Sequence, residues 1–141
     1  MDTRQEEIVY RVLLVDDKMT TVSFLGRFLR ELGYEVVPAY NGEEALKLYE
    51  AGSFDIVVTD IRMEPMDGVT LLTELHRKDA DLPAIMISGM NDVRAASEAM
   101  KAGAFDYLEK PFDGYELAAT MNRALAYRQA ASGLLNLALL Y

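Results

Sequence analysis

The sequence predicts an α/β fold, in which a doubly wound, five-stranded parallel sheet is covered by five helices. Short runs rich in β-branched residues alternate with stretches in which apolar residues recur every three or four positions. Such alternation indicates parallel strands joined by right-handed helical crossovers, with helices on both faces of the sheet. The length of 141 residues suits one domain around a single core.

The first expected strand and helix set the pattern for the rest of the chain. The run "VLLVDD" at 12–17 is apolar until its last two residues, and apolar residues then recur at helical spacing over 22–32. Gly33 comes next, and glycine is the usual residue just after a helix because it tolerates the left-handed conformation. The second strand, "YEVVPAY" at 34–40, is expected directly afterwards.

The remaining elements repeat this alternation. Asn41 and Asn91 precede the second and fourth expected helices, and we expect their side-chain oxygens to act as N-caps. The segment "DLP" at 81–83 closes the third helix. The later strands are the runs "FDIVVTD" at 54–60, "PAIMISG" at 83–89 and "FDYLEKP" at 105–111.

Charged and hydroxyl side chains stand where the expected strands end. The first strand ends in Asp16 and Asp17, the third in Asp60, the fourth in Ser88 and the fifth in Lys110. Functional sites of parallel sheets form beyond these carboxyl ends, at the switch in strand order. Two carboxylates about 4 Å apart repel by roughly 4 kcal/mol at an effective dielectric near 20. Another group must therefore offset the repulsion within the adjacent acidic pair.

A divalent cation fits this edge of the sheet. The three carboxylates and the ammonium group of Lys110 together carry a charge of −2. Mg²⁺ prefers hard oxygen ligands and commonly uses one or two carboxylates with waters and phosphate oxygens. A single Asp at a strand end is more often a cap or a turn former than a ligand. Turn chemistry does not explain three acids and a lysine together, so we expect a magnesium site.

Composition excludes several other classes of function. The net charge of −9 argues against direct nucleic-acid binding, which depends on clustered Lys and Arg. The chain has no cysteine, and therefore no disulfide, thiol nucleophile or zinc–thiolate site. Its first ten residues are acidic and lack an apolar segment, and no apolar run approaches the roughly 20 residues of a membrane span. We expect a cytoplasmic protein without a membrane segment. The one histidine, His76, is expected on the surface without a role.

Taken together, the motifs resemble the receiver domain of two-component response regulators. The matching stretches are "LLVDD", "VVTDIRM" with "MDG", "IMISG" and "KAGAFDYLEKPF". The longer stretch "DVRAASEAMKAGAFDYLEKPF" is most similar to receivers of alternative-sigma-factor (sigma-54 type) transcriptional activators. The resemblance covers residues 10–128 and leaves an N-terminal extension, 1–9, and an apolar tail, 129–141. It implies a flavodoxin-like sheet with strand order 2-1-3-4-5.

The resemblance also implies roles for the residues at the strand ends. It assigns Asp60 as the phosphoacceptor, Asp16 and Asp17 as the magnesium-binding pair, Ser88 as the switch hydroxyl and Lys110 as the phosphate clamp. Asp60 would be both the acceptor and a metal ligand. The cofactor implied is Mg²⁺, and the phosphoryl donor implied is a phosphohistidine on a sensor histidine kinase.

Three further features belong to the same resemblance. The main-chain carbonyl of Arg62 would complete the metal site, Tyr107 would be the rotating aromatic, and the Lys110–Pro111 peptide would be cis. The chain would then be a signalling domain rather than an enzyme, although it takes part in its own phosphorylation. Phosphorylation would change the surface of the fourth helix, fifth strand and fifth helix and control the oligomeric state of a transcriptional activator. The output domain is expected on the same natural chain.

The sequence departs from the family pattern at two places. Proline usually stands four residues after the acceptor, whereas here Glu64 takes that position and Pro65 follows. Glu64 is expected in solvent, the alternative being an extra carboxylate near the metal. The apolar end is the second departure. We expect the fifth helix to pass Gly133 and pair with a second chain, although a frayed end or a tail folded onto its own domain is also compatible with the sequence.

Three other classes of protein are alternatives to a phosphorylated receiver. A phosphatase with an aspartyl-phosphate intermediate resembles the pattern Asp-x-Asp-x-Thr, and nothing like it follows Val15 or Thr59. A flavin carrier would need loops rich in Ser, Thr and Gly around the flavin phosphate, whereas the first loop here is acidic. A receiver that only binds proteins, independently of phosphorylation, would not need the full set of acids, hydroxyl and lysine.

Overall fold

The structure of the chain is a computed structural model that describes residues 8–140, and over 133–140 it describes the backbone alone. The expected extension 1–9 is thus covered only from residue 8. The apolar side chains of the expected tail, from Gly133 onward, lie outside the described part. Among the described helices, none has the length and apolar character needed to cross a bilayer.

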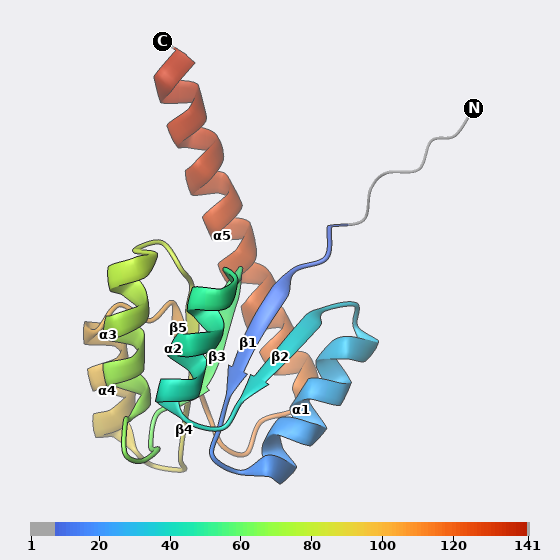
Figure 1. The fold of residues 1–141 in the computed structure, drawn as a ribbon, viewed down its shortest axis with the longest axis vertical. Helices are drawn as coiled ribbons and strands as arrows, with labels where there is room; N and C mark the ends of the chain where they lie inside the picture. The colour runs from blue at the N-terminus through green and yellow to red at the C-terminus, as the bar shows by residue number, and fades with distance from the viewer. Residues whose placement is uncertain (1–7, 141) are drawn as a thin grey trace.

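Within residues 8–140, five parallel strands form one sheet in the order β2-β1-β3-β4-β5, which confirms the predicted fold (Figure 1). The strands are β1 (Arg11–Val15), β2 (Glu35–Ala39), β3 (Ile56–Asp60), β4 (Ala84–Ser88) and β5 (Asp106–Glu109). The helices are α1 (Met19–Glu31), α2 (Gly42–Ala51), α3 (Gly68–Lys78), α4 (Val93–Lys101) and α5 (Gly114–Leu140).

The switch in strand order falls at β1, which pairs with β2 on one side and β3 on the other. Leu13 lies in register with Val37 of β2 and with Val57 of β3. The chain therefore builds outward in opposite directions from β1, and the sites of parallel sheets lie beyond the carboxyl ends of the strands at such a switch. The residues that follow these two strands are those that the sequence singled out.

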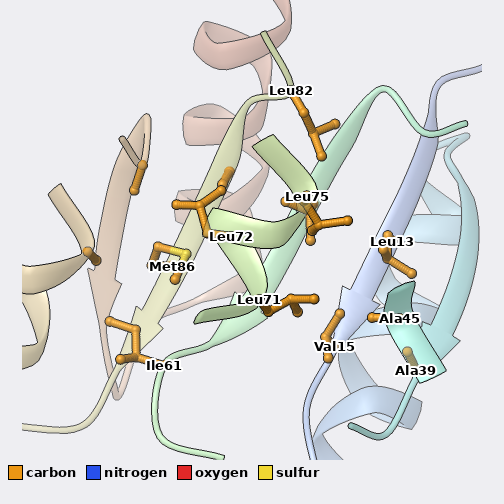
Figure 2. Packing of buried hydrophobic residues seen from close by; sticks show 14 of the residues in the cluster. Leu13, Val15, Ala39, Ala45, Ile61, Leu71, Leu72, Leu75, Leu82 and Met86 are labelled. Atoms are coloured by element: carbon orange, nitrogen blue, oxygen red, sulfur yellow. The ribbon is translucent and has the colours of Figure 1, made fainter. Parts of the chain in front are cut away.

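Alternation along the strands feeds two separate hydrophobic layers. Leu13 and Val15 pack with Leu71 and Leu75 of α3, on the face covered by α2, α3 and α4 (Figure 2). Strand residues of the opposite parity, such as Leu14, pack under α1 and α5. Both faces of the sheet are thus buried, as expected for a parallel sheet, and the strands are held rigidly enough to fix the side chains at their ends.

The helix ends follow the sequence signals at two of the expected places. Asn41 caps α2, because its Oδ1 accepts a hydrogen bond from the Glu44 N–H at 2.8 Å. Gly33 follows α1 with φ of 98°, a conformation that glycine adopts at little cost. The expectation for Asn91 is wrong. Asp92 caps α4, and Asn91 instead takes a left-handed φ of 61° in the preceding loop.

The helix α5 leaves the domain at the end of the sheet opposite the carboxyl ends of the strands (Figure 1). From the sequence we expect this helix to pass Gly133, and in the structure α5 continues to Leu140. Arg128 fixes α5 near the point where this helix leaves the domain, because its Nη2 lies 2.8 Å from Oδ2 of Asp79. The hydroxyl of Tyr49 donates to the same carboxylate oxygen at 2.8 Å. We call Tyr49, Asp79 and Arg128 the base clamp.

Candidate functional site

Three carboxylates converge beyond the carboxyl ends of β1 and β3. Asp16 and Asp17 follow β1, Asp60 ends β3, and one carboxylate oxygen from each lies within 4.8 Å of the others. Asp16 is 3% exposed and Asp60 is 7% exposed, whereas Asp17 faces solvent. We call these three residues the acidic edge. Hard oxygen ligands at this spacing, open to solvent on one side, fit a small divalent cation such as Mg²⁺.

Lys110 places an ammonium group opposite these acids. Its Nζ lies 3.7 Å from Oδ2 of Asp16 and 3.7 Å from Oδ2 of Asp60. The backbone N–H of Lys110 donates to the carbonyl of Ser88 at 2.9 Å, which ties the end of β5 to the end of β4. The Lys110–Pro111 peptide is cis, the conformation that the resemblance implies. One ammonium group thus faces two buried carboxylates.

The acidic edge is electrostatically unfavourable, and Lys110 reduces this cost without cancelling it. Burial raises the pKa of Asp60, and the charges of Asp16 and Asp17 raise it further against the opposing effect of Lys110. Burial likewise raises the pKa of Asp16, although the Lys18 N–H donates to its Oδ1 at 2.9 Å. Folding therefore holds these carboxylates where their ionised form is disfavoured, and a bound cation would remove that penalty.

The loop between β3 and α3 is closed tightly behind Asp60. The N–H of Gly68 donates to the carbonyl of Ile61 at 2.8 Å, and a Cβ at residue 68 would collide with the carbonyl oxygen of Asp60. Only glycine allows this close approach. Glu64 and Pro65 are exposed on the same loop, in agreement with the expectation that Glu64 points into solvent, and the peptide between them is cis.

Ser88 and Tyr107 both line a small cavity. Ser88 is buried, and its Oγ lies 3.5 Å from the carbonyl of Leu108, at the outer limit of a hydrogen bond. The side chain of Tyr107 is 40% exposed. A cavity of about 220 Å³ between β4, β5 and α4 is lined by both residues and by Ala96 and Met100. The hydroxyl group of Ser88 is therefore weakly held, and the cavity beside it leaves space for the side chain of Tyr107 to move inward.

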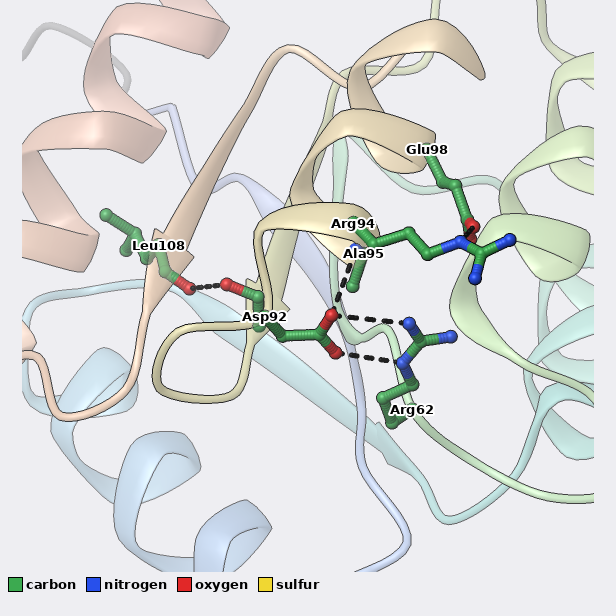
Figure 3. Close-up of polar contacts among 7 residues, drawn as sticks. Arg62, Asp92, Arg94, Ala95, Glu98 and Leu108 are labelled. Atoms are coloured by element: carbon green, nitrogen blue, oxygen red, sulfur yellow. Dashed lines mark hydrogen bonds and ion pairs between the residues drawn. The ribbon is translucent and has the colours of Figure 1, made fainter.

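Sequence reasoning missed one polar contact near the site and one contact of a residue away from it. Arg62 was singled out only for its carbonyl, but its side chain forms an ion pair with Asp92, the N-cap of α4, at 2.9 Å (Figure 3). An Asp just before a helix is a recognised cap signal, so Asp92 was detectable in the sequence. His76 was expected on the surface. It is partly buried there, with Nε2 2.9 Å from the carbonyl of Leu82.

Comparison with known proteins identifies relatives of the whole folded domain. Residues 12–122 match the family described as the response regulator receiver domain. The transcriptional regulatory protein ZraR of Salmonella typhimurium is 40% identical over 116 residues, which are 82% of this chain and 26% of ZraR. The C4-dicarboxylate transport transcriptional regulatory protein DctD of Pseudomonas aeruginosa is 42% identical over 122 residues, 84% of this chain and 26% of DctD. The chain thus spans about a quarter of the length of these relatives.

Solved structures agree with the sequence matches. A response regulator receiver domain protein from Clostridium thermocellum superposes with a TM-score of 0.83 at 30% identity, over 87% of this chain and 99% of that one. NtrX from Brucella abortus superposes with a TM-score of 0.88 at 29% identity, over 92% of this chain and 30% of that one. The expected likeness to receivers of longer transcriptional regulators is confirmed by these similarities.

Proposed function

We propose, for a chain that belongs to the response regulator receiver domain family, that Asp60 accepts a phosphoryl group from a sensor histidine kinase and so switches the molecule between two signalling states. One observation carries the proposal. The buried carboxylate of Asp60 lies 3.7 Å from the ammonium group of Lys110 and shares its edge of the sheet with two further acids. This is the arrangement that a phosphoryl-accepting carboxylate requires.

The chemistry of the transfer follows from these groups. A carboxylate is a weak nucleophile toward phosphorus, so it must be held in line with the leaving group while the incoming charge is neutralised. An oxygen of Asp60 forms a P–O bond as the P–N bond to the donor imidazole breaks, and the imidazole leaves with the bonding electrons. Lys110 then has its ammonium group beside the non-bridging phosphoryl oxygens. The product is the modified protein itself, so the domain is a signalling module rather than an enzyme that turns over a substrate.

Asp16, Asp17, Asp60 and the main-chain carbonyl of Arg62 would hold a Mg²⁺ ion at the acidic edge. When bound, the ion supplies positive charge that compensates both the carboxylates and the phosphoryl oxygens. The raised pKa values of Asp16 and Asp60 support this assignment, because they mark carboxylates that lack sufficient compensation from Lys110 alone. The protein's own contribution is to orient the acids at fixed positions on two adjacent strands.

The signal would leave the site through Ser88 and Tyr107. A phosphoryl group adds nearly two negative charges, which attract the hydroxyl of Ser88 toward Asp60. The weak contact between Ser88 and the carbonyl of Leu108 costs little to break. The aromatic side chain of Tyr107, now partly exposed, would then enter the cavity beside Ser88. The surface formed by α4, β5 and α5 changes as a result, and we assign it as the output surface.

The partners follow from the length of the relatives and from α5. A sensor histidine kinase would supply the phosphoryl group to this chain in the cytoplasm. An output domain on the same natural chain would act on transcription, so the receiver itself would not bind nucleic acid. The tail 129–141 has no charged residue, and we propose that it pairs with its copy in a homodimer. Light scattering on the full chain and on a version that ends at Arg128 tests the dimer. A monomer in both, at tens of micromolar, contradicts it.

The phosphoacceptor is tested by forming its adduct. With Mg²⁺ and acetyl phosphate, the wild type should gain the mass of one phosphoryl group, and Asp60→Asn should gain none. Asp67→Asn is a matched control. Asp67 lies in the loop that follows Asp60, but its side chain caps α3 by accepting from the Thr70 N–H. The control should be modified like the wild type. Equal modification of Asp60→Asn would contradict the assignment.

A further inference from the structure

We propose that Arg62 and Asp92 form a latch that holds the loop between β4 and α4 in its unphosphorylated position and thereby sets how readily Asp60 is occupied. The inference rests on the proposed phosphorylation of Asp60 and adds two positioning residues to it. Neither side chain is among the groups that the proposed reaction uses.

The latch joins two elements that are far apart in the sequence. The guanidinium group of Arg62 meets the carboxylate of Asp92 through two contacts, Nε to Oδ2 at 2.9 Å and Nη2 to Oδ1 at 3.3 Å (Figure 3). Oδ1 of Asp92 also accepts a hydrogen bond from the Ala95 N–H at 3.1 Å. One carboxylate therefore caps α4 and binds the loop that follows Asp60. Through this carboxylate, Arg62 holds the first turn of α4.

The loop that carries Asp92 is short and begins at the switch hydroxyl. Only residues 89–91 separate Ser88 from Asp92, and the Asp92 N–H donates back to the carbonyl of Gly89 at 3.2 Å. On the other side, the Asn91 N–H donates to Oε1 of Glu109 at 2.8 Å. A loop of this length, held from both sides, cannot absorb a shift of Ser88 by itself. Movement of Ser88 toward Asp60 would therefore displace Asp92 relative to Arg62.

A second ion pair in the same region offers a matched comparison. Nε of Arg94 lies 3.4 Å from Oε1 of Glu98, one turn further along α4 (Figure 3). Both partners belong to one helix, so this pair moves as a unit when α4 moves. It has the same charges as the latch and is more exposed, but it joins no second element. Removing it should leave the loop between β4 and α4 unaffected.

Breaking the latch should favour the occupied state. The ion pair stabilises only the resting position of the loop, so its loss lowers the cost of moving Ser88, and linkage requires tighter binding of any group that draws Ser88 inward. Beryllofluoride, which mimics a phosphoryl group on a carboxylate, is a suitable probe. An exposed ion pair contributes little to stability. In the presence of Mg²⁺, we therefore expect Arg62→Gln to be half-saturated at a beryllofluoride concentration about two- to fivefold lower than the wild type.

Asp92→Asn tests the other side of the latch without loss of the cap. Asn caps helices about as well as Asp, so α4 should keep its first turn while the charge pair is lost. We expect the same fold-change as in Arg62→Gln. The double variant should show no further gain, because both substitutions remove one shared interaction. Arg94→Gln should bind beryllofluoride like the wild type.

Titration with beryllofluoride, followed by amide NMR, measures both affinity and conformation. In the variants without the latch, the Ser88 and Tyr107 signals of the free protein should already lie part of the way toward their bound positions. Unchanged or weaker binding in both Arg62→Gln and Asp92→Asn would overturn the latch, as would an equal gain in Arg94→Gln. Absence of beryllofluoride binding by the wild type would instead contradict phosphorylation at Asp60, so the two failures are distinguishable.

Discussion

Each end of the sheet holds an aspartate that is partly shielded from water, but the two ends differ in how well the carboxylate charge is compensated. At the carboxyl ends of the strands, Asp60 shares the acidic edge with two other acids and meets the ammonium group of Lys110 at 3.7 Å. At the opposite end, Asp79 belongs to the base clamp and receives hydrogen bonds of 2.8 Å from both Arg128 and Tyr49. The charge of the Asp60 carboxylate is incompletely compensated, whereas that of Asp79 is stabilised by two short hydrogen bonds.

The direction of each pKa shift expresses this difference. Burial raises the pKa of Asp60, and Lys110 does not compensate for it. Burial would also raise the pKa of Asp79, but the hydrogen bonds from Arg128 and Tyr49 outweigh it and lower the pKa. Burial, together with the hydrogen bond to Asp79, raises the pKa of Tyr49 to about 12. A buried carboxylate is thus a cost at one end of the sheet and a source of stability at the other.

The base clamp stabilises the fold at the end of the sheet opposite the acidic edge. The base clamp joins α2, the end of α3 and α5, and Arg128 also donates to the carbonyl of Asp55 just before β3 at 3.4 Å. The hydroxyl of Tyr10 and the amide of Gln129 make a further contact at this end. These interactions fix where α5 leaves the domain. Their favourable contribution offsets part of the electrostatic cost at the opposite end, where burial raises the pKa of Asp16 and Asp60.

The largest effect is expected from opening the base clamp. Arg128→Gln removes a charged hydrogen bond and leaves Asp79 partly buried, so the free energy of unfolding at pH 7 should fall by about 3 kcal/mol. Arg123→Gln is the control on the same helix, because its pair with Asp106 is 3.6 Å long and largely exposed. It should lose less than about 1 kcal/mol. Urea unfolding measures both, and equal losses would mean that the clamp has no special weight.

The difference between wild type and Arg128→Gln should also depend on pH. The pKa of Asp79 is lowered in the folded state, so the contribution of its hydrogen bonds is complete above the ordinary value of about 3.9 and is lost as the pH falls through the lower folded value. The gap in stability should therefore be constant from pH 7 to about pH 4.5 and narrow below pH 4. A gap that narrows already near pH 6 would point to another group.

A smaller gain is expected at the acidic edge when magnesium is added. At ten times its dissociation constant, a ligand that binds only the folded state stabilises it by about 1.4 kcal/mol. Mg²⁺ should raise the melting temperature of the wild type accordingly and that of Asp17→Asn much less. Asp67→Asn, which alters an acid that caps α3, should respond like the wild type. An identical response in Asp17→Asn would show that the acidic pair is not the metal site.

The sequence predicted the fold and the acidic edge because both follow from local patterns joined by one general rule. Apolar runs marked the strands, and the carboxyl ends of parallel strands necessarily share one edge. Asp16, Asp60 and Lys110 could therefore be placed together although up to 94 positions separate them. Their roles in phosphotransfer come from the family resemblance and remain predictions.

The contacts that the sequence did not predict depend on tertiary placement. Arg62 and Asp92 are 30 residues apart, and Asp79 and Arg128 are 49 apart, with no pattern that links either pair. The N-cap of α4 was misplaced by one residue because Asn91 and Asp92 both suit that position. Only the backbone conformation distinguishes them, with Asn91 at φ of 61° and Asp92 accepting from the Ala95 N–H.

The most direct test compares the two ends by the sign of one substitution. In metal-free buffer, Asp60→Asn removes a charge that burial and two neighbouring acids disfavour, so the free energy of unfolding should rise, by an amount on the order of 1 kcal/mol. Asp79→Asn removes a charge that Arg128 and Tyr49 stabilise, so it should fall. Urea unfolding of the two variants beside the wild type measures both changes. Opposite signs are the predicted result, and a loss of stability in Asp60→Asn comparable to that in Asp79→Asn would contradict the account.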